Sequence, residues 1–252
     1  MNVRSARRFE VVLFDLGSTL IYFDGVWYQV MAESIQQLAA ALKQNGFDIQ
    51  PEKFIPMFQE RLRTYYIERD KAFIEFTTEY VLYLLLEDLG IKPVEVKRLR
   101  PCLDAMYAVT EAHWHAEVDA VPMLSILKEE GYKLGLVSNA ADVWNVYRLL
   151  DKNKLKPYFE LVLISASVGI RKPHPRIFLM ALDHFRVRPS QVVMVGDTLS
   201  ADILGARQVD IASVWINRWS SEPGNRVFED AIFPDAVISR LSELPDLLRN
   251  WE

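Results

Sequence analysis

Short apolar runs that recur along the chain place the strongest limit on its fold. Each run is four or five residues long, is rich in Val, Ile and Leu, and is bounded by Gly, Asp, Ser or Asn. Continuous apolar character is typical of strands that are covered on both faces, and helix-like segments separate the last four runs. The alternation predicts an α/β fold with right-handed crossovers and a parallel sheet. The five predicted strands are Val11–Phe14, Lys133–Val137, Leu161–Ile164, Val192–Val195 and Ala212–Ile216.

A long insertion interrupts this pattern. More than a hundred residues separate the first predicted strand from the second, and they show no strand pattern. Apolar residues at helical spacing instead predict a small helical bundle, with Pro56 and Pro101 indicating kinks or breaks. Its four predicted helices cover residues 26–44, 51–69, 77–89 and 93–114. A further helix is predicted over 200–208, between the last two strands.

Composition narrows the possible partners. Lys and Arg number 29 against 34 Asp and Glu, a formal charge of −5, so no basic field attracts nucleic acid or an anionic membrane. No apolar run approaches the roughly 20 residues that cross a bilayer. The single Cys102 forms no intramolecular disulfide and is typical of a reducing, cytoplasmic setting. Nothing in the sequence specifies an oligomeric state.

Polar residues follow the predicted strands where the chain leaves them. Asp15 comes directly after the first strand, Ser138 follows the second and Lys172 lies beyond the third. Asp197 follows the fourth strand, and Asp202 comes five residues later. Ligands bind an open parallel sheet at the carboxyl ends of its strands, so these side chains are expected to converge. Carboxylates suit a divalent cation, and lysine and hydroxyl groups suit an anion. The sequence therefore predicts a phosphate and magnesium site.

Four segments in this order resemble the motifs of the haloacid dehalogenase-like hydrolase superfamily, in the subgroup with a helical cap after the first motif. They are residues 15–20, 138–139, 169–178 and 196–202. One such motif is weak evidence, whereas four in order are strong. The resemblance implies a Rossmann-like, doubly wound core formed by residues 1–20 and 116–252. Residues 21–115 would form the cap domain.

The resemblance also implies roles for individual residues. Asp15 would be the nucleophile, Thr19 and Ser138 phosphate contacts, and Lys172 a positive clamp on the transferring group. The implied activity is a phosphatase that acts on a small phosphorylated metabolite through an aspartyl phosphate, with Mg²⁺ as cofactor. The implied magnesium ligands are Asp15, the backbone carbonyl of Gly17, Asp197 and Asp202.

Residues within and next to these motifs are assigned to the substrate. Ser18 and Asn139 adjoin the phosphate contacts, and the aromatic run that contains Tyr22 and Trp27 lies where the chain enters the insertion. These rings are expected to line the substrate entrance when a cap closes and excludes water. The predicted substrate-binding residues are Ser18, Asn139, Tyr22 and Trp27.

The first motif departs from the superfamily pattern. Phosphatases of this superfamily usually carry a second Asp two residues after the nucleophile, which protonates the leaving oxygen and later activates water. Here Gly17 occupies that position. Ser18 occupies the next position, where the family usually has glycine. The departure predicts a slow or leaving-group-restricted phosphatase, unless a nearby residue such as Asp24 or His174 replaces the acid.

Three alternatives remain open from the sequence. A 2-haloacid dehalogenase also lacks the second Asp, although two acids near residue 200 would repel a carboxylate substrate. A phosphonatase-like enzyme would use a cap lysine, either Lys43 or Lys53, as a Schiff base. A catalytically impaired scaffold would keep phosphate and magnesium affinity without turnover.

Overall fold

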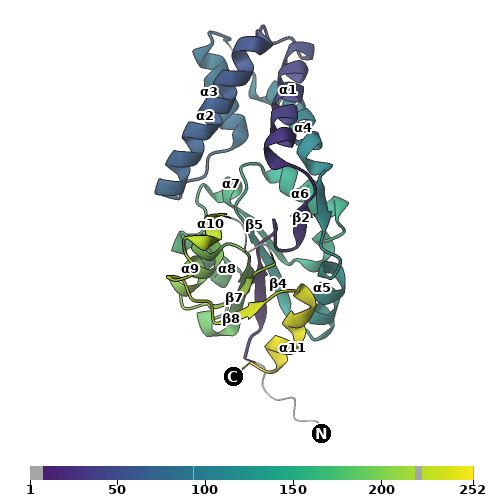
Figure 1. Cartoon of the computed structure of the whole chain (residues 1–252), viewed down its shortest axis with the longest axis vertical. Helices are drawn as coiled ribbons and strands as arrows, with labels where there is room; N and C mark the ends of the chain where they lie inside the picture. The colour runs from purple at the N-terminus through teal and green to yellow at the C-terminus, as the bar shows by residue number, and fades with distance from the viewer. Residues whose placement is uncertain (1–7, 93, 219–222, 252) are drawn as a thin grey trace.

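The core of the protein is a parallel sheet with helices on both faces. The computed structural model describes residues 8–92, 94–218 and 223–251. Within them, six strands lie in the order β5-β4-β1-β6-β7-β8, and every neighbouring pair is parallel (Figure 1). The strands are β1 (Val11–Phe14), β4 (Lys133–Ser138), β5 (Leu161–Ile164), β6 (Val192–Gly196), β7 (Ala212–Ile216) and β8 (Ala236–Ile238). The predicted α/β fold is confirmed, and β8 is a short strand that the sequence pattern missed.

Successive residues of the central strands face opposite layers of core. Val12 and Phe14 of β1 pack under the helices on one face, whereas Val11 and Leu13 pack under those on the other. This two-sided burial explains why the strands are apolar throughout. Taken along the chain, the strand order corresponds to 3-2-1-4-5-6, which is the doubly wound order with its switch point between β1 and β6.

Helices of the core cover the two faces of this sheet. α5 (Ala120–Glu129), α6 (Val143–Lys152) and α11 (Leu244–Arg249) pack on one face. α8 (Pro175–Phe185) and α9 (Leu204–Arg207) pack on the other. Shorter helices are α7 (Ser165–Val168), α10 (Pro223–Arg226), η1 (Lys156–Tyr158), η2 (Pro189–Gln191) and η4 (Leu241–Glu243).

The segment predicted as a helix over residues 200–208 is helical, but it is not an α-helix from its start. The chain instead forms one turn of π-helix, η3 (Leu199–Ile203), before α9 begins. A turn of π-helix is rare and often occurs at functional sites. Here it determines where Asp202 points, as described below.

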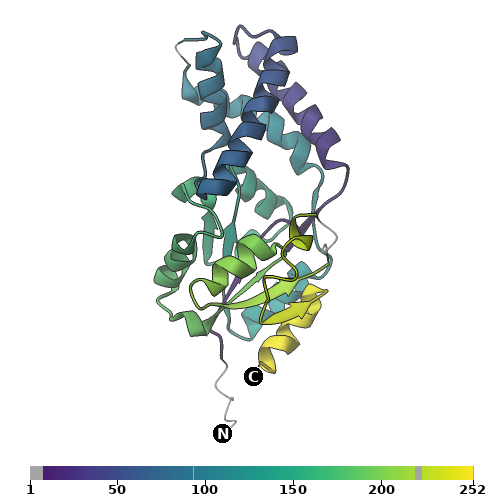
Figure 2. The same ribbon diagram turned by 60° about the vertical axis from the view of Figure 1, so that its left-hand side comes forward.

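The inserted residues form a helical bundle with its own hydrophobic core, which lies beyond one end of the sheet (Figures 1 and 2). Its helices are α1 (Trp27–Gln44), α2 (Pro51–Ala72), α3 (Thr78–Asp88) and α4 (Val96–Glu111). Pro56 and Pro101 each lie at the sixth position of their helix, and both helices continue past them. Each proline therefore costs one backbone hydrogen bond near a helix start without ending the helix. In the described parts of the chain, no helix is both long and apolar enough to cross a membrane.

The prediction that the insertion contains no strand is wrong at both of its ends. β2 (Ile21–Phe23) pairs antiparallel with β3 (Trp114–Ala116), so the two chain segments that join bundle and core form one small ribbon. The helix predicted to reach residue 114 therefore ends at Glu111. Strands of three residues are too short to show a period, and their pairing joins segments about ninety residues apart in sequence.

A second connection between bundle and core lies away from this ribbon. The segment between α2 and α3 pairs with the core at Ile74 and Ile170, and Arg171 N–H donates to the Phe73 carbonyl at 3.1 Å. On the other side, Arg100 of α4 donates to Asp142 at 2.6 Å, and Asp142 also caps α6. The bundle is therefore held against the core at several points around the strand ends.

Candidate active site

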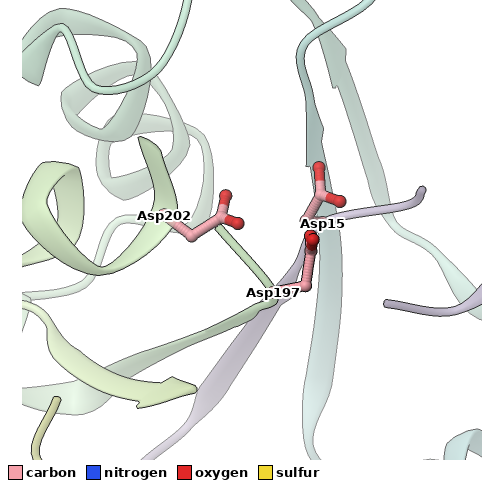
Figure 3. Close-up of side chains that lie close together, drawn as sticks. All are labelled: Asp15, Asp197 and Asp202. Atoms are coloured by element: carbon pink, nitrogen blue, oxygen red, sulfur yellow. The ribbon is translucent and has the colours of Figure 1, made fainter. Parts of the chain in front are cut away.

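Three carboxylates gather at the switch point of the sheet. Asp15 follows β1, Asp197 follows β6, and Asp202 lies in η3 (Figure 3). One carboxylate oxygen from each lies within 4.8 Å of the others, and all three residues are buried. Because β1 and β6 are hydrogen-bonded neighbours, Asp15 N–H donates to Val195 O at 3.0 Å, and the two strand ends are held side by side. The convergence predicted from the sequence is present in the structure.

Asp202 reaches this group because a glycine leaves it room. A Cβ atom added at Gly196 would lie 2.3 Å from Cγ and from Oδ2 of Asp202, a separation that real atoms do not adopt. The Asp202 carboxylate lies against the bare backbone and accepts a hydrogen bond from Thr198 N–H at 3.0 Å. The close packing of strand end and π-turn therefore fixes this side chain.

Lys172 connects the carboxylates. Its Nζ atom lies 2.7 Å from Asp15 Oδ1 and 2.6 Å from Asp202 Oδ1, and its side chain is 1% exposed. Burial alone would lower the pKa of Lys172, but the two neighbouring carboxylates raise it above its ordinary value. The ammonium group is therefore kept charged inside the site.

Asn139 holds the backbone of Lys172 from both sides. Its Nδ2 atom donates to the Lys172 carbonyl at 2.9 Å, and its Oδ1 atom accepts from Lys172 N–H at 2.8 Å. Both polar atoms of an amide that was predicted to bind substrate are thus engaged in positioning the lysine, although Asn139 also lines the cavity described below.

The carboxylates of Asp15, Asp197 and Asp202, here called the acid group, carry more negative charge than Lys172 balances. Burial and the charges of Asp15 and Asp202 raise the pKa of Asp197 well above its ordinary value. Burial also raises the pKa of Asp202 to about 6, against the opposing effect of Lys172. Carboxylates crowded in this way disfavour their own ionisation unless a cation joins them. The donor set, which is all oxygen, fits a hard divalent cation such as Mg²⁺.

Two side chains that the sequence analysis missed hold the backbone of Asp197. Trp215 Nε1 and Asn225 Nδ2 both donate to the Asp197 carbonyl, at 2.8 and 2.9 Å, and Asn225 Oδ1 accepts from Leu199 N–H at 2.9 Å. Asn225 lies far from the motif in sequence and carries no local signal. It is found only when the fold brings it to η3.

The other predicted phosphate and substrate contacts take different positions. Thr19 is fully buried and donates to Asp197 Oδ1 at 3.3 Å. Ser138 lies at the end of β4 and lines the cavity. Ser18 also lines the cavity and has a φ of 56°, a left-handed conformation in which glycine is less strained.

A cavity of about 320 Å³ opens onto the acid group. Apart from the predicted residues, Arg171 and Trp114 contribute to its wall. Tyr22 and Trp27, the predicted entrance residues, do not line it, and they contact aromatic neighbours on the ribbon. The lining residues are Asp15, Gly17, Ser18, Trp114, Ser138, Asn139, Arg171, Lys172, Asp197, Thr198, Ala201 and Asp202.

The two residues considered as replacements for the missing acid, and the two lysines considered for a Schiff base, do not line this cavity. Asp24 is exposed at the ribbon, where its carbonyl lies 2.5 Å from Nδ1 of His113. His174 caps α8 by accepting from Arg176 N–H at 3.2 Å. Lys43 and Lys53 are exposed on α1 and α2. None of these four residues shares the cavity with Asp15.

A larger cavity of about 900 Å³ lies between α2 and α3 and shares no lining residue with the acid group. Most of its wall is apolar, and the charged side chains among its lining residues come from α2. The charged groups at the sheet edge, and not the size of a cavity, therefore identify the candidate active site.

Known proteins resemble this chain in sequence. Residues 9–210 match the family described as haloacid dehalogenase-like hydrolase. A glyceraldehyde 3-phosphate phosphatase from Methanopyrus kandleri is 30% identical over 243 residues, covering 95% of this chain and 97% of the relative. A phosphoserine phosphatase from Thermus thermophilus is 32% identical over 166 residues, covering 66% of this chain and 63% of the relative.

Solved structures agree with the sequence relatives. A phosphatase of this family from Thermococcus onnurineus has a TM-score of 0.65 at 25% identity and covers 95% of this chain and 98% of its own. A 2-haloacid dehalogenase from Pseudomonas syringae has a TM-score of 0.68 at 28% identity and covers 97% of this chain and all of its own. The sequence match over most of the described core, together with a full-length relative at 30% identity, shows that the chain belongs to the family of haloacid dehalogenase-like hydrolases.

Proposed function

We propose that the protein is a Mg²⁺-dependent phosphatase that hydrolyses a small phosphorylated metabolite through an aspartyl-phosphate intermediate. The observation that carries the proposal is the position of Lys172, whose Nζ atom lies 2.7 Å from Asp15 and 2.6 Å from Asp202 in a group of three buried carboxylates. Relatives named as phosphatases of glyceraldehyde 3-phosphate and of phosphoserine support a small phosphate ester as substrate.

Asp15 is proposed as the nucleophile. One carboxylate oxygen attacks phosphorus, the bond from phosphorus to the leaving oxygen breaks, and the leaving group departs with the electron pair. Water then attacks the phosphorus of the aspartyl phosphate, which releases phosphate and restores the carboxylate. The two steps replace one difficult displacement by two easier ones.

Lys172 and the hydroxyl of Ser138 are proposed to bind the equatorial oxygens of the phosphoryl group. The buried ammonium is fixed by Asn139 through its backbone and by two carboxylates through its side chain. A fixed positive charge in a site of low polarity stabilises the charge that develops on the transferring group. Thr19, which donates to Asp197, is proposed to orient that carboxylate.

Asp15, Asp197 and Asp202 are proposed to hold Mg²⁺, together with the backbone carbonyl of Gly17. When bound, the ion supplies positive charge that allows an anionic nucleophile and an anionic phosphate to approach. The raised pKa values of Asp197 and Asp202 support this assignment, since they reflect burial first and the neighbouring carboxylate charges second, and a bound cation would offset both.

Gly17 restricts the proposed reaction. It lines the cavity two residues after Asp15, and it has no side chain that can donate a proton to the leaving oxygen. Loss of general acid catalysis typically costs about 10²- to 10⁴-fold in rate, or roughly 3 to 5 kcal/mol of barrier. Aryl and acyl phosphates, whose leaving groups need little protonation, are therefore the proposed favoured class.

The helical insertion, residues 21–115, is proposed to act as the cap domain over a core formed by residues 1–20 and 116–252. The division is supported by the separate hydrophobic core of the four helices and by the ribbon of β2 and β3 at both ends of the insertion. The contact of residues 73–75 with residues 169–171 supports a cap that is seated on the core.

The experiment that tests the function measures hydrolysis of p-nitrophenyl phosphate with and without Mg²⁺, on the natural protein and on Asp15→Asn. Metal-dependent release of p-nitrophenol is expected, and the substitution is expected to reduce kcat by roughly 10³-fold or more, because the nucleophile is lost. Activity that persists in Asp15→Asn, or in excess chelator, would contradict the proposal.

A 2-haloacid dehalogenase is the second candidate, because a dehalogenase is among the structural relatives and Gly17 lacks the acid. The same assay includes a 2-haloacid, and halide release in the presence of chelator would favour this function. The three clustered carboxylates argue against it, since they would repel a carboxylate substrate without a cation to neutralise them.

A further inference from the structure

Trp114 is the one aromatic side chain among the residues that line the acidic cavity. It begins β3, the strand by which the chain returns from the helical insertion to the core. The remaining wall consists of five charged residues, the polar residues Ser18, Ser138, Asn139 and Thr198, and the small residues Gly17 and Ala201. Trp114 is therefore the one large apolar side chain in this wall.

The indole ring lies directly over Gly17. A Cβ atom added at Gly17 would lie 3.4 Å from Cη2 and 3.8 Å from Cζ3 of Trp114, which are ordinary van der Waals contacts. Any atoms beyond that Cβ would compete with the ring for the same part of the cavity. The missing side chain at position 17 and the large side chain at position 114 thus complement each other in volume.

Neighbouring rings hold the indole in place. Phe23 lies opposite Trp114 in the ribbon, with ring centroids 5.2 Å apart at 72°. Trp27 contacts both rings, at 5.0 Å from Phe23 and 6.4 Å from Trp114. Edge-to-face contacts of this kind stabilise a defined ring orientation. The six-membered half of the indole is left to face Gly17 and the cavity.

We infer that Trp114 is the residue that selects the leaving group, and that it does so by packing against a planar, apolar group on the ester oxygen. This inference rests on the proposed function, which places the phosphoryl group among the carboxylates and Lys172. The group attached to phosphorus must then extend along the remaining wall of a cavity of about 320 Å³. Trp114 is the surface there that gains free energy from contact with an aromatic ring.

The inference adds a preference in binding to the preference for leaving groups that need little protonation, which follows from Gly17. An acyl phosphate and an aryl phosphate both release good leaving groups, so the absence of an acid at position 17 does not distinguish them. Contact with Trp114 does, because a ring pair contributes free energy that a small acyl group cannot gain. A planar aromatic or similarly flat leaving group is therefore the substrate class that fits this pocket.

The test measures binding separately from turnover. Dissociation constants of phenylphosphonate and methylphosphonate, which are not hydrolysed, are measured by titration calorimetry in excess Mg²⁺. The variants are Trp114→Ala, Trp114→Leu and, as the matched control, Trp144→Ala, whose indole is 61% exposed on α6 and lies outside the cavity. Acetyl phosphate hydrolysis by each protein reports the proposed function independently, because its acyl group needs neither an acid nor a ring contact.

The natural protein is expected to bind phenylphosphonate roughly three- to tenfold more tightly than methylphosphonate. Trp114→Ala is expected to reduce this ratio to near one, Trp114→Leu to an intermediate value, and Trp144→Ala to leave it unchanged. The Leu variant preserves apolar bulk at the ribbon if the Ala variant does not fold. A ratio that is equal in the natural protein and in either folded Trp114 variant would overturn the inference, even when acetyl phosphate is hydrolysed. Absence of acetyl phosphate hydrolysis alongside a Trp114-dependent ratio would instead overturn the proposed phosphatase while supporting the aromatic contact.

Discussion

In this site, the space that a small residue leaves free matters as much as the chemical groups that other residues supply. Gly196 is essential to the geometry because Asp202 occupies the volume where a Cβ would stand. Gly17 shows a second use of the same principle, since its missing side chain leaves room for the indole of Trp114. A close approach of side chain to backbone requires glycine at position 196, whereas at position 17 a Cβ would fit and only a longer side chain would meet the indole.

Gly196→Ala adds only one methyl group, but it is expected to displace a carboxylate of the acid group. The new Cβ would meet the Asp202 carboxyl at 2.3 Å, so Asp202 must move away from Lys172. Overpacking of this kind costs about 1–3 kcal/mol of stability. Urea unfolding measures that loss, and phosphatase assays are expected to show a fall in kcat of about tenfold or more, because 1.36 kcal/mol in the barrier is a factor of ten.

Gly17→Ala is the matched control for stability, since its new Cβ approaches Trp114 no closer than 3.4 Å. We expect its free energy of unfolding to stay within about 0.5 kcal/mol of the natural value. Equal losses for the two substitutions would show that the short contact at Gly196 is relieved without displacing Asp202.

Among the helices and strands, the sequence predicted those whose pattern of burial can be read along the chain. It missed those that depend on contacts between distant segments. Five of the six strands of the large sheet and the α/β class followed from continuous apolar runs, because both faces of the sheet are covered. β2 and β3 were missed because three residues carry no measurable period. The π-turn at Leu199–Ile203 was not distinguished from an α-helix, because the two differ in backbone hydrogen bonding, which the apolar pattern of so short a segment does not report.

The site shows the same division. Asp15, Lys172 and Asp197 could be predicted because they follow strand ends directly or lie in recognisable motifs. Asn225 and Trp215 hold the Asp197 carbonyl from other parts of the chain, and Trp114 reaches the cavity from the far end of the insertion. Contacts between segments so distant in sequence leave no local pattern.

The segment between α2 and α3 contains a buried acid that joins bundle and core. Glu75 Oε1 accepts from Tyr65 Oη at 2.6 Å, and its Oε2 atom accepts from Ser165 Oγ at 2.9 Å. Arg69 and Arg171 lie 3.5 and 3.7 Å from the same carboxylate, whose side chain is 0% exposed. Ser165 Oγ also accepts from Ala140 N–H at 2.9 Å, beside the loop that carries Ser138 and Asn139.

Glu75→Gln is expected to lower the free energy of unfolding by about 2–3 kcal/mol, because it removes charged hydrogen bonds and leaves two arginines less compensated. Urea denaturation measures the loss. Glu60→Gln serves as the control, since Glu60 pairs with Arg63 on the exposed surface of α2 and its removal is expected to leave stability unchanged within error. A Glu75 variant as stable as the control would show that the contact between bundle and core does not depend on this charge.

For the molecule as a whole, the net charge of −5 is less informative than where the charge is concentrated. Three buried carboxylates lie at the switch point of the sheet, and one buried lysine pairs with two of them, Asp15 and Asp202. Hydrogen bonds hold these groups in place: Thr198 N–H donates to Asp202, and Trp215 and Asn225 donate to the Asp197 carbonyl. The proposed Mg²⁺ would relieve the repulsion, so cofactor binding and the stability of the whole fold should be linked.

This linkage predicts a pH-dependent effect of Mg²⁺ on thermal unfolding. Burial raises the pKa of Asp202 to about 6 and that of Asp197 well above its ordinary value, whereas both would titrate near 3.8 in the unfolded chain. An acid whose pKa is raised by folding stabilises the fold below its unfolded pKa and loses that contribution as the pH rises through its folded pKa. In chelator, the contribution of Asp202 is therefore expected to fall between about pH 4 and pH 6, and that of Asp197 to fall as the pH rises above its ordinary pKa. Mg²⁺ binds their ionised forms, so it should raise Tm by a few degrees near pH 8 and by much less near pH 5. Calorimetric scans with Mg²⁺ and with chelator at both pH values measure the difference, and Asp202→Asn should reduce it. An equal rise in Tm at both pH values would show that the ion binds elsewhere.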